Sequence, residues 1–147
     1  MQTADDIEDS ARRHKQNSDF ATALELRLRL EQLIVDCDAD RRSKNYNWIA
    51  FLAVRTGDLQ NAVRAARQSL ELYSSLVGQP DARLATYTFM LACALASAGQ
   101  YDEAVSYGER GIELYEKTGH DPSYVGFRRR DVARMRERET GVYLDRT

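Results

Sequence analysis

The chain has 147 residues, which suits one domain with a workable hydrophobic core, and its 43% hydrophobic and 30% charged residues are those of an ordinary soluble protein. No stretch approaches the roughly 18 apolar residues of a membrane-spanning helix, and the first residues lack the apolar region of a secretory signal, so we expect a cytoplasmic protein without a membrane partner. The formal net charge is only −2, and because only three of the 21 basic residues are lysine, the composition favours a GC-rich, bacterial source.

Two helices are predicted at the start of the chain. The first covers about residues 3–16, turns Ile7 and Ala11 inward and is otherwise charged, as suits the end of a stack. The second covers about 19–36 and carries apolar residues on two faces at helical spacing. A helix that is apolar on two faces is covered on both sides, so we expect this one to lie inside the fold.

Five further helices follow, and no strand pattern occurs between them. Gly78 ends one helix, and Asp121 with Pro122 starts the last one as N-cap and first helical residue. Gly108 and Gly111 fall inside a predicted helix and weaken it. The predicted helices cover about residues 41–56, 58–77, 81–98, 102–118 and 122–140, and we expect residues 141–147 to be a loose, flexible tail.

A repeat with a period of 42 residues organises the middle of the chain. Gly57 and Gly99 each end a helix with the positive φ that glycine tolerates, and Ala62 and Ala104 lie near the start of the next helix. These small residues allow the two helices of a hairpin to approach to the usual ~8–10 Å. A single hairpin cannot bury its outer apolar faces, so the period predicts a stack of helical hairpins.

The spacing of small and aromatic residues resembles the tetratricopeptide repeat, in which small residues stand at the eighth and twentieth positions and an aromatic residue at the seventeenth. The period here is longer than the family's common ~34 residues and resembles its long-helix variant. The residues at the three places are Ala92, Tyr101 and Ala104 when Ala85 is the first position, and Ala50, Leu59 and Ala62 when Ser43 is the first position.

The resemblance implies an all-α fold: a right-handed α-solenoid of about three helical hairpins plus a C-terminal capping helix, with about seven helices in all. Arg134 occupies the small-residue position of the last helix, where no second helix could pack across it, so we expect that helix to cap the stack. We expect a single domain over residues 1–140, with repeats at about 4–37, 41–78 and 81–118 and the capping helix at 122–140.

The sequence carries no recognisable catalytic or metal-binding motif. It lacks the HExxH pattern, a glycine-rich phosphate loop and the GxSxG motif. The two histidines, His14 and His120, fall at opposite ends of the predicted stack, and Cys37 and Cys93 lack the neighbours of a metal or redox site. We therefore expect a protein that is not an enzyme and has no cofactor or metal.

The resemblance also implies a concave groove, lined in this family by the second, fifth, ninth, twelfth and thirteenth positions of the first helix of each pair. Phe51 and Phe89 fall outside the packing stripe, and a ring beside the amide of Asn47 would suit a bound peptide; the alternative is that both rings pack against the next hairpin. Basic residues nearby favour an acidic segment. The candidates for partner binding are Lys44, Asn47, Phe51, Arg55, Thr86, Phe89 and Cys93, and Arg12 and Lys15 add positive charge to the same groove.

Charge is unevenly placed along the chain, with acidic residues at 5–9 and an arginine run in the last helix. Three interpretations of the arginines stay open: a solvated capping face, docking on an acidic surface such as the first helix of another copy, and nucleic-acid binding. The third has the least support, because neither interleaved aromatic residues nor a recognition-helix pattern accompanies the arginines. The candidates for electrostatic docking are Arg128, Arg129, Arg130 and Arg134.

Three functions are compatible with these patterns. The first is a non-catalytic adaptor, scaffold or regulatory subunit that binds a peptide or helix of a partner protein in the groove. The second is a structural protein that self-assembles through its acidic and basic ends, with the groove filled by a neighbouring chain or by its own tail, Val142-Tyr143-Leu144. The third is the ligand-sensing part of a transcriptional regulator.

Overall fold

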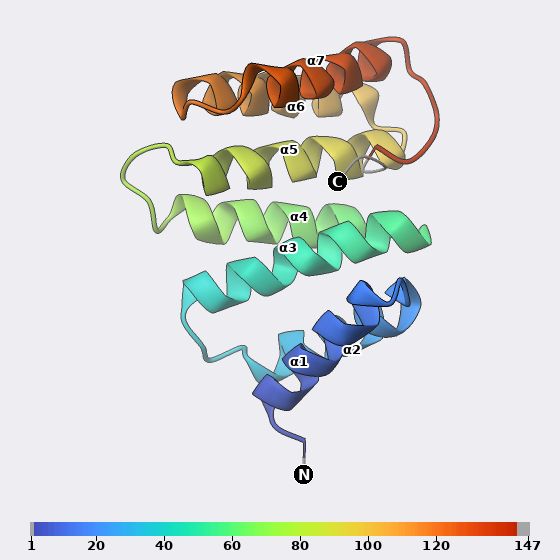
Figure 1. Ribbon diagram of the computed structural model, residues 1–147, viewed down its shortest axis with the longest axis vertical. Coiled ribbons are helices and arrows are strands. Elements are labelled where there is room, and N and C mark those ends of the chain that lie inside the picture. Colours follow the sequence, from blue (N-terminus) through green and yellow to red (C-terminus); the bar gives the residue numbers. More distant parts are fainter. Residues whose placement is uncertain (1, 144–147) are drawn as a thin grey trace.

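A computed structural model of the chain describes residues 2–143, which contain seven α-helices and no β-strand (Figure 1). The all-α stack of paired helices predicted from the sequence is therefore confirmed. The helices are α1 (Ala4–Gln16), α2 (Phe20–Leu33), α3 (Ala39–Thr56), α4 (Leu59–Ser74), α5 (Ala82–Ser97), α6 (Tyr101–Lys117) and α7 (Pro122–Arg136).

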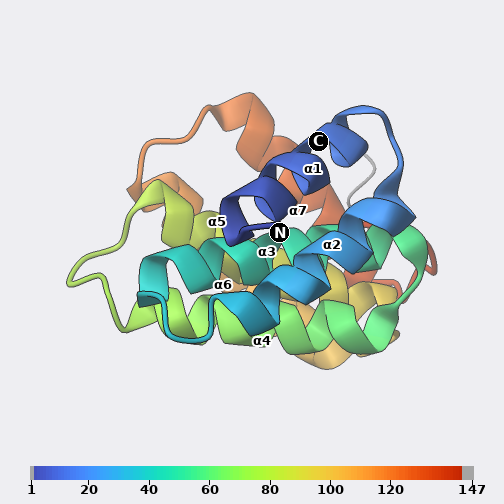
Figure 2. The same cartoon turned by 90° about the horizontal axis from the view of Figure 1, so that it is seen from below.

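The helices stack in chain order from α1 to α7, and each packs against its neighbour in sequence (Figure 1). Helix α3 also contacts α5 directly. Figure 2, which looks along the stack from below, shows α1, α5 and α7 toward the top and α4 and α6 toward the bottom. The odd helices thus form one layer, and this is the layer that carries the predicted groove residues.

Aspartate side chains begin most of the helices. Each accepts a hydrogen bond from a backbone N–H of the first turn, which satisfies a donor that has no partner inside the helix. The N-cap predicted at Asp121, with Pro122 as the first helical residue, is confirmed. The capping aspartates are Asp19, Asp38, Asp58, Asp81 and Asp121.

Small residues lie where the helices of a hairpin meet. Ala50 and Ala62 between α3 and α4, and Ala92 and Ala104 between α5 and α6, are all 0% exposed. Helix α6 approaches its neighbours closely at Gly108, because a Cβ added there would lie 2.8 Å from Cγ2 of Val132 in α7. Gly108 was expected only to weaken its helix, and the structure shows that it also makes room for α7.

The apolar side chains form one large core and one small one. The large core runs from Ala23 in α2 to the residues that follow α7. The small core consists of three buried side chains, Ile7, Leu30 and Ile34, at the outer corner of α1 and α2. The first hairpin therefore shares only part of its apolar surface with the rest of the stack.

Several predicted helix ends lie too far along the chain. Helices α2, α4 and α7 end three or four residues earlier than expected, and after α7 the backbone of Arg138 has a φ of +56°, which cannot continue a helix. The buried face of α7 includes an arginine and leaves out an aromatic residue, because Arg128 is buried whereas Phe127 is 44% exposed.

The segment after α7 was expected to be loose, and this is wrong for its described part. Tyr143 is 2% exposed and belongs to the large core. The ring is buried because the chain turns back after Arg138 and lays residues 141–143 against α5. Residues 144–147 of the predicted tail lie outside the described residues.

Candidate partner-binding surface

Aromatic rings and cations gather where α1, α2 and α3 meet. Phe51 packs edge-to-face against Phe20 and against Trp48, with ring centroids 6.5 and 5.9 Å apart. The Lys15 ammonium lies 5.2 Å from the Trp48 ring and 5.6 Å from the Phe51 ring, and the Arg55 guanidinium lies 5.4 Å from Phe51. We call these five residues, Lys15, Phe20, Trp48, Phe51 and Arg55, the basic–aromatic surface.

Lys15 differs from the other cations nearby in its surroundings. Within residues 2–143 no carboxylate lies within 4.0 Å of its half-buried ammonium group, which has only the two rings as partners. Arg12, one turn before it, bonds Asp9 at 2.8 Å, and Lys44 bonds Asp40 at 3.1 Å. Lys15 therefore offers a positive charge that the described part of the chain does not neutralise by a direct ion pair.

Asn47 lies one helical turn before Phe51 and is half-buried. Its Oδ1 atom is buried and accepts no hydrogen bond from any group in the described residues. A buried amide oxygen without a donor costs about 1–3 kcal/mol. The oxygen can gain a donor from outside the described residues only when the Asn47 side chain turns outward.

A buried arginine supports Trp48 from the side of α2. Arg27 is 3% exposed, its guanidinium lies 5.6 Å from the Trp48 ring, and Nη1 donates to Oδ1 of Asn45 at 3.3 Å. Burial lowers the pKa of Arg27 to about 10, because the charged group loses water, while Glu8 at 3.6 Å opposes this shift. Arg27 was not among the residues predicted to form the site, although it shares a helical face with the buried Ala23 and Leu30.

The second half of the predicted groove is closed. Phe89 is 1% exposed, lies 6.1 Å from the Tyr115 ring and is covered by the Arg128 guanidinium at 4.9 Å. Cys93 is fully buried, and burial raises the pKa of its thiol to about 12. Thr86 is half-buried and donates to the carbonyl of Ala82 in its own helix. For Phe89, packing against the next helix is thus what the structure shows.

The arginines of α7 find partners within the chain. Arg128 is buried, and its Nε donates to the Tyr124 hydroxyl at 3.1 Å while Nη1 bonds Asp131 at 3.2 Å. Its candidacy for electrostatic docking is therefore wrong, because the guanidinium does not reach the surface. Among the other candidates, Arg129 bonds Glu116 at 2.8 Å, Arg134 bonds Glu139 at 3.0 Å, and Arg130 lies 5.4 Å from the Phe127 ring.

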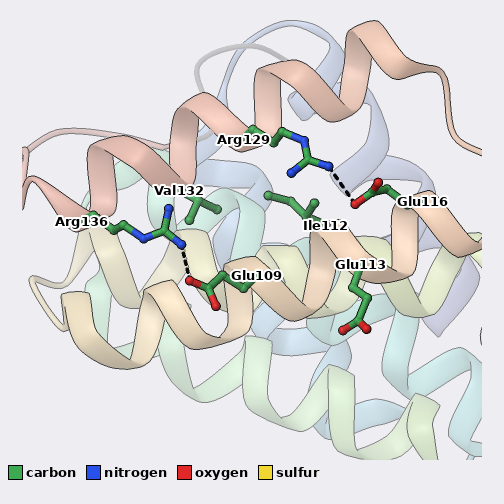
Figure 3. Close-up of a pocket in the computed structure, with 7 residues that line it drawn as sticks. All are labelled: Glu109, Ile112, Glu113, Glu116, Arg129, Val132 and Arg136. Carbon is green, nitrogen blue, oxygen red and sulfur yellow. Dashed lines mark hydrogen bonds and ion pairs between the residues drawn. The ribbon is translucent and has the colours of Figure 1, made fainter.

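An open cleft of about 410 Å³ lies between α6 and α7, and Figure 3 shows the residues that line it. Two ion pairs, Arg129 with Glu116 and Arg136 with Glu109, bridge its walls. The apolar residues between them are almost fully buried, with Val132 2% and Ile112 7% exposed. The cleft therefore presents paired charges and little apolar surface to a ligand.

Nowhere in residues 2–143 do three or more His, Cys, Asp or Glu side chains gather in a way that could hold a metal ion. None of the seven helices in that range has both the length and the apolar character needed to cross a membrane.

The chain is similar to known proteins in both sequence and fold. A family model of the tetratricopeptide repeat matches residues 41–117. Two crystal structures have a similar fold. Both contain nearly identical TPR-like repeats of a protein described as a kinesin light chain of Podosopora anserina, and one of the two is a point variant. The variant has a TM-score of 0.74 and 20% identity, and the alignment covers 92% of this chain and 66% of that one. The other has a TM-score of 0.68 and 19% identity, with 92% and 72% covered. No curated protein matches the chain significantly.

Proposed function

The chain belongs to the tetratricopeptide repeat family, and from this premise we propose that it is a non-catalytic module that binds a segment of a partner protein at the basic–aromatic surface. Repeats of this family generally mediate protein–protein interaction. The observation that supports this site is the Lys15 ammonium, which lies over two aromatic rings without a carboxylate partner in residues 2–143.

An acidic segment with apolar side chains would fit this surface best. A partner carboxylate would pair with Lys15, and a charge-assisted hydrogen bond of this kind is about twice as strong as a neutral one. An adjacent apolar side chain would pack on the exposed part of Trp48. If the Asn47 side chain turns outward, its Oδ1, which has no donor among the described residues, would accept a backbone N–H of the segment. One turn of α3 thus supplies the hydrogen bond through Asn47 and the apolar contact through Trp48, and the neighbouring α1 supplies the charge through Lys15.

Self-assembly through oppositely charged ends receives less support. At the basic end, Arg129 and Arg136 are paired with glutamates of α6, and at the acidic end Asp5 bonds Arg41 at 2.8 Å. A contact between copies would have to break these pairs first. The role in a transcriptional regulator, the cytoplasmic location and the bacterial source stay predictions.

Fluorescence of Trp48, the single tryptophan, tests the proposal. The probe is a synthetic peptide of alternating aspartate and leucine, compared with one of alternating lysine and leucine. We expect saturable binding of the acidic peptide alone, and Lys15→Gln should weaken it about fivefold or more, as the loss of ~1 kcal/mol implies.

Lys117→Gln is the matched control, because Lys117 is 63% exposed on α6 and its ion pair with Glu113 lies far from α1. It removes the same charge and should leave the affinity unchanged. If the two substitutions weaken binding equally, the acidic peptide is attracted by the net charge of the protein. That result would contradict a site at Lys15.

A further inference from the structure

The chain reverses direction after α7 and returns to α5. Figure 1 shows this segment leaving the end of α7 and descending to the C-terminal half of α5. The left-handed backbone of Arg138 starts the reversal, and the Tyr101 hydroxyl donates to the carbonyl of Glu139 at 3.2 Å. Gly141, with a φ of +134°, then directs the chain against the odd-helix layer.

Tyr143 is held there by contacts of four kinds. The Arg134 guanidinium lies 4.5 Å from the centre of its ring. Its hydroxyl donates to the carbonyl of Glu139, and its own carbonyl accepts a hydrogen bond from Cys93 Sγ at 3.7 Å. The ring is 2% exposed and belongs to the large core, with Val142 packed partly beside it.

These contacts describe a socket, which we define by Cys93, Arg134 and Glu139. Cys93 comes from α5, Arg134 from α7 and Glu139 from the turn after α7. The face of the Tyr143 ring contacts the Arg134 cation, and the ring hydroxyl donates to a carbonyl. The socket therefore has a partner for the aromatic ring and another for the hydroxyl of a tyrosine. The residues that occupy the socket form a short segment outside any helix. Gly141 gives the backbone of this segment more conformational freedom than a helical segment would have.

We propose that this socket is a binding site for a short tyrosine-bearing segment, occupied within the chain by residues 141–143 and able to accept an equivalent segment from another protein once they leave. The socket shares no residue with the basic–aromatic surface. Displacement would uncover Cys93, which lies under the backbone of Tyr143.

Thiol labelling of the full-length chain tests the proposal. In a Cys37→Ser background Cys93 is the only cysteine, and we expect it to react slowly with Ellman's reagent. Tyr143→Ala should raise the rate at least tenfold, whereas Tyr143→Phe, which keeps the ring over Arg134, should stay close to the parent. The probe is a fluorescein-labelled peptide with the sequence of residues 139–147. It should bind the Tyr143→Ala variant, slow the labelling of Cys93 again, and bind the parent at least tenfold more weakly.

The same peptide with alanine in place of its tyrosine should neither bind nor protect. Labelling of Tyr143→Ala at the parent rate, or equal binding of the two peptides, would overturn the proposal. If Tyr143→Ala loses its helical circular dichroism and the peptide does not restore it, Tyr143 is an ordinary core residue and the proposal is also overturned. Arg134→Gln provides a second variant, in which weaker stacking should give intermediate labelling and binding. Trp48 emission reports on the other surface, so failure at one site is distinguishable from failure at the other.

Discussion

Gly108 lies at a close contact between α6 and α7. We expect Gly108→Ala to lower the free energy of unfolding by about 1–3 kcal/mol, because the new methyl group would meet Cγ2 of Val132 at 2.8 Å and overpack the contact. Urea denaturation followed by circular dichroism measures this change. The usual helix-stabilising effect of alanine acts in the opposite direction and is smaller.

Gly126 in α7 is the matched control, because a Cβ added there meets nothing within 4 Å. Gly126→Ala should raise the free energy of unfolding by roughly 0.5–1 kcal/mol, since alanine is the better helix former. If Gly108→Ala instead raises the free energy of unfolding, α7 can move away from α6 without loss of stability. That result would contradict the tight contact.

Individual residues differ in how far the sequence could predict them. The positive φ of Gly57 and Gly99 followed from the turn they occupy and is confirmed at +81° and +80°. The burial of Phe89 could not be predicted, because it depends on how α7 is rotated about its axis and on where Arg128 then lies. Seven candidates for partner binding were named, and their role stays a prediction; the structure leaves Lys44 exposed and buries Cys93.

At the scale of elements, a small ion-pair cluster joins the start of α3 to the start of α5. Arg83 Nη1 bonds Asp40 at 2.6 Å, and Lys44 bonds the same carboxylate at 3.1 Å. The hydrogen bond from Arg83, and then that from Lys44, lowers the pKa of Asp40 below its ordinary value. A carboxylate with a lowered pKa in the folded state contributes stability above the unfolded pKa of about 4, and this is lost as the pH falls through the folded pKa.

We therefore expect Asp40→Asn to destabilise the protein at pH 7 and to have no effect near pH 2. Asp40 is 47% exposed, so solvent screening limits the loss to about 0.5–1 kcal/mol. Thermal unfolding at several pH values measures the difference. Asp102→Asn, which breaks the pair with Arg138 at a 93% exposed carboxylate, should change little at any pH. A deficit for Asp40→Asn that persists at pH 2 would point to a cause other than charge.

Helix starts were easier to predict than helix ends. Aspartate side chains mark the starts chemically, and Asp121 with Pro122 identified the start of α7 directly. No glycine follows the last turn of α2, so the apolar pattern suggested a longer helix than the one that forms. Gly78 was expected to end the helix that became α4, but this helix ends four residues earlier at Ser74. The spacing of apolar residues does not show at which residue the backbone carbonyl groups of the last helical turn begin to face solvent.

At the scale of the whole molecule, the 42-residue period was sufficient to predict the fold. Each hairpin needs a neighbour to bury its apolar faces, so a repeat implies a stack whatever the surface residues are. The surfaces themselves depend on contacts between distant segments, and the return of residues 141–143 to α5 has no signal in the period. The boundaries of the domain and its repeats stay predictions.

The separate small core of Ile7, Leu30 and Ile34 has a consequence for how the molecule opens. Helix α1 has only Ile7 and Ala11 as buried residues and is otherwise tied by charge, for example by Arg41 to Asp5 at 2.8 Å. At 1 M salt, where the Debye length is about 3 Å, these ties weaken while the large core does not. We expect hydrogen–deuterium exchange of the α1 amides to accelerate with salt and that of α5 to stay constant. The stack of helices should therefore open first at its N-terminal end, where α1 can separate while the large core stays folded.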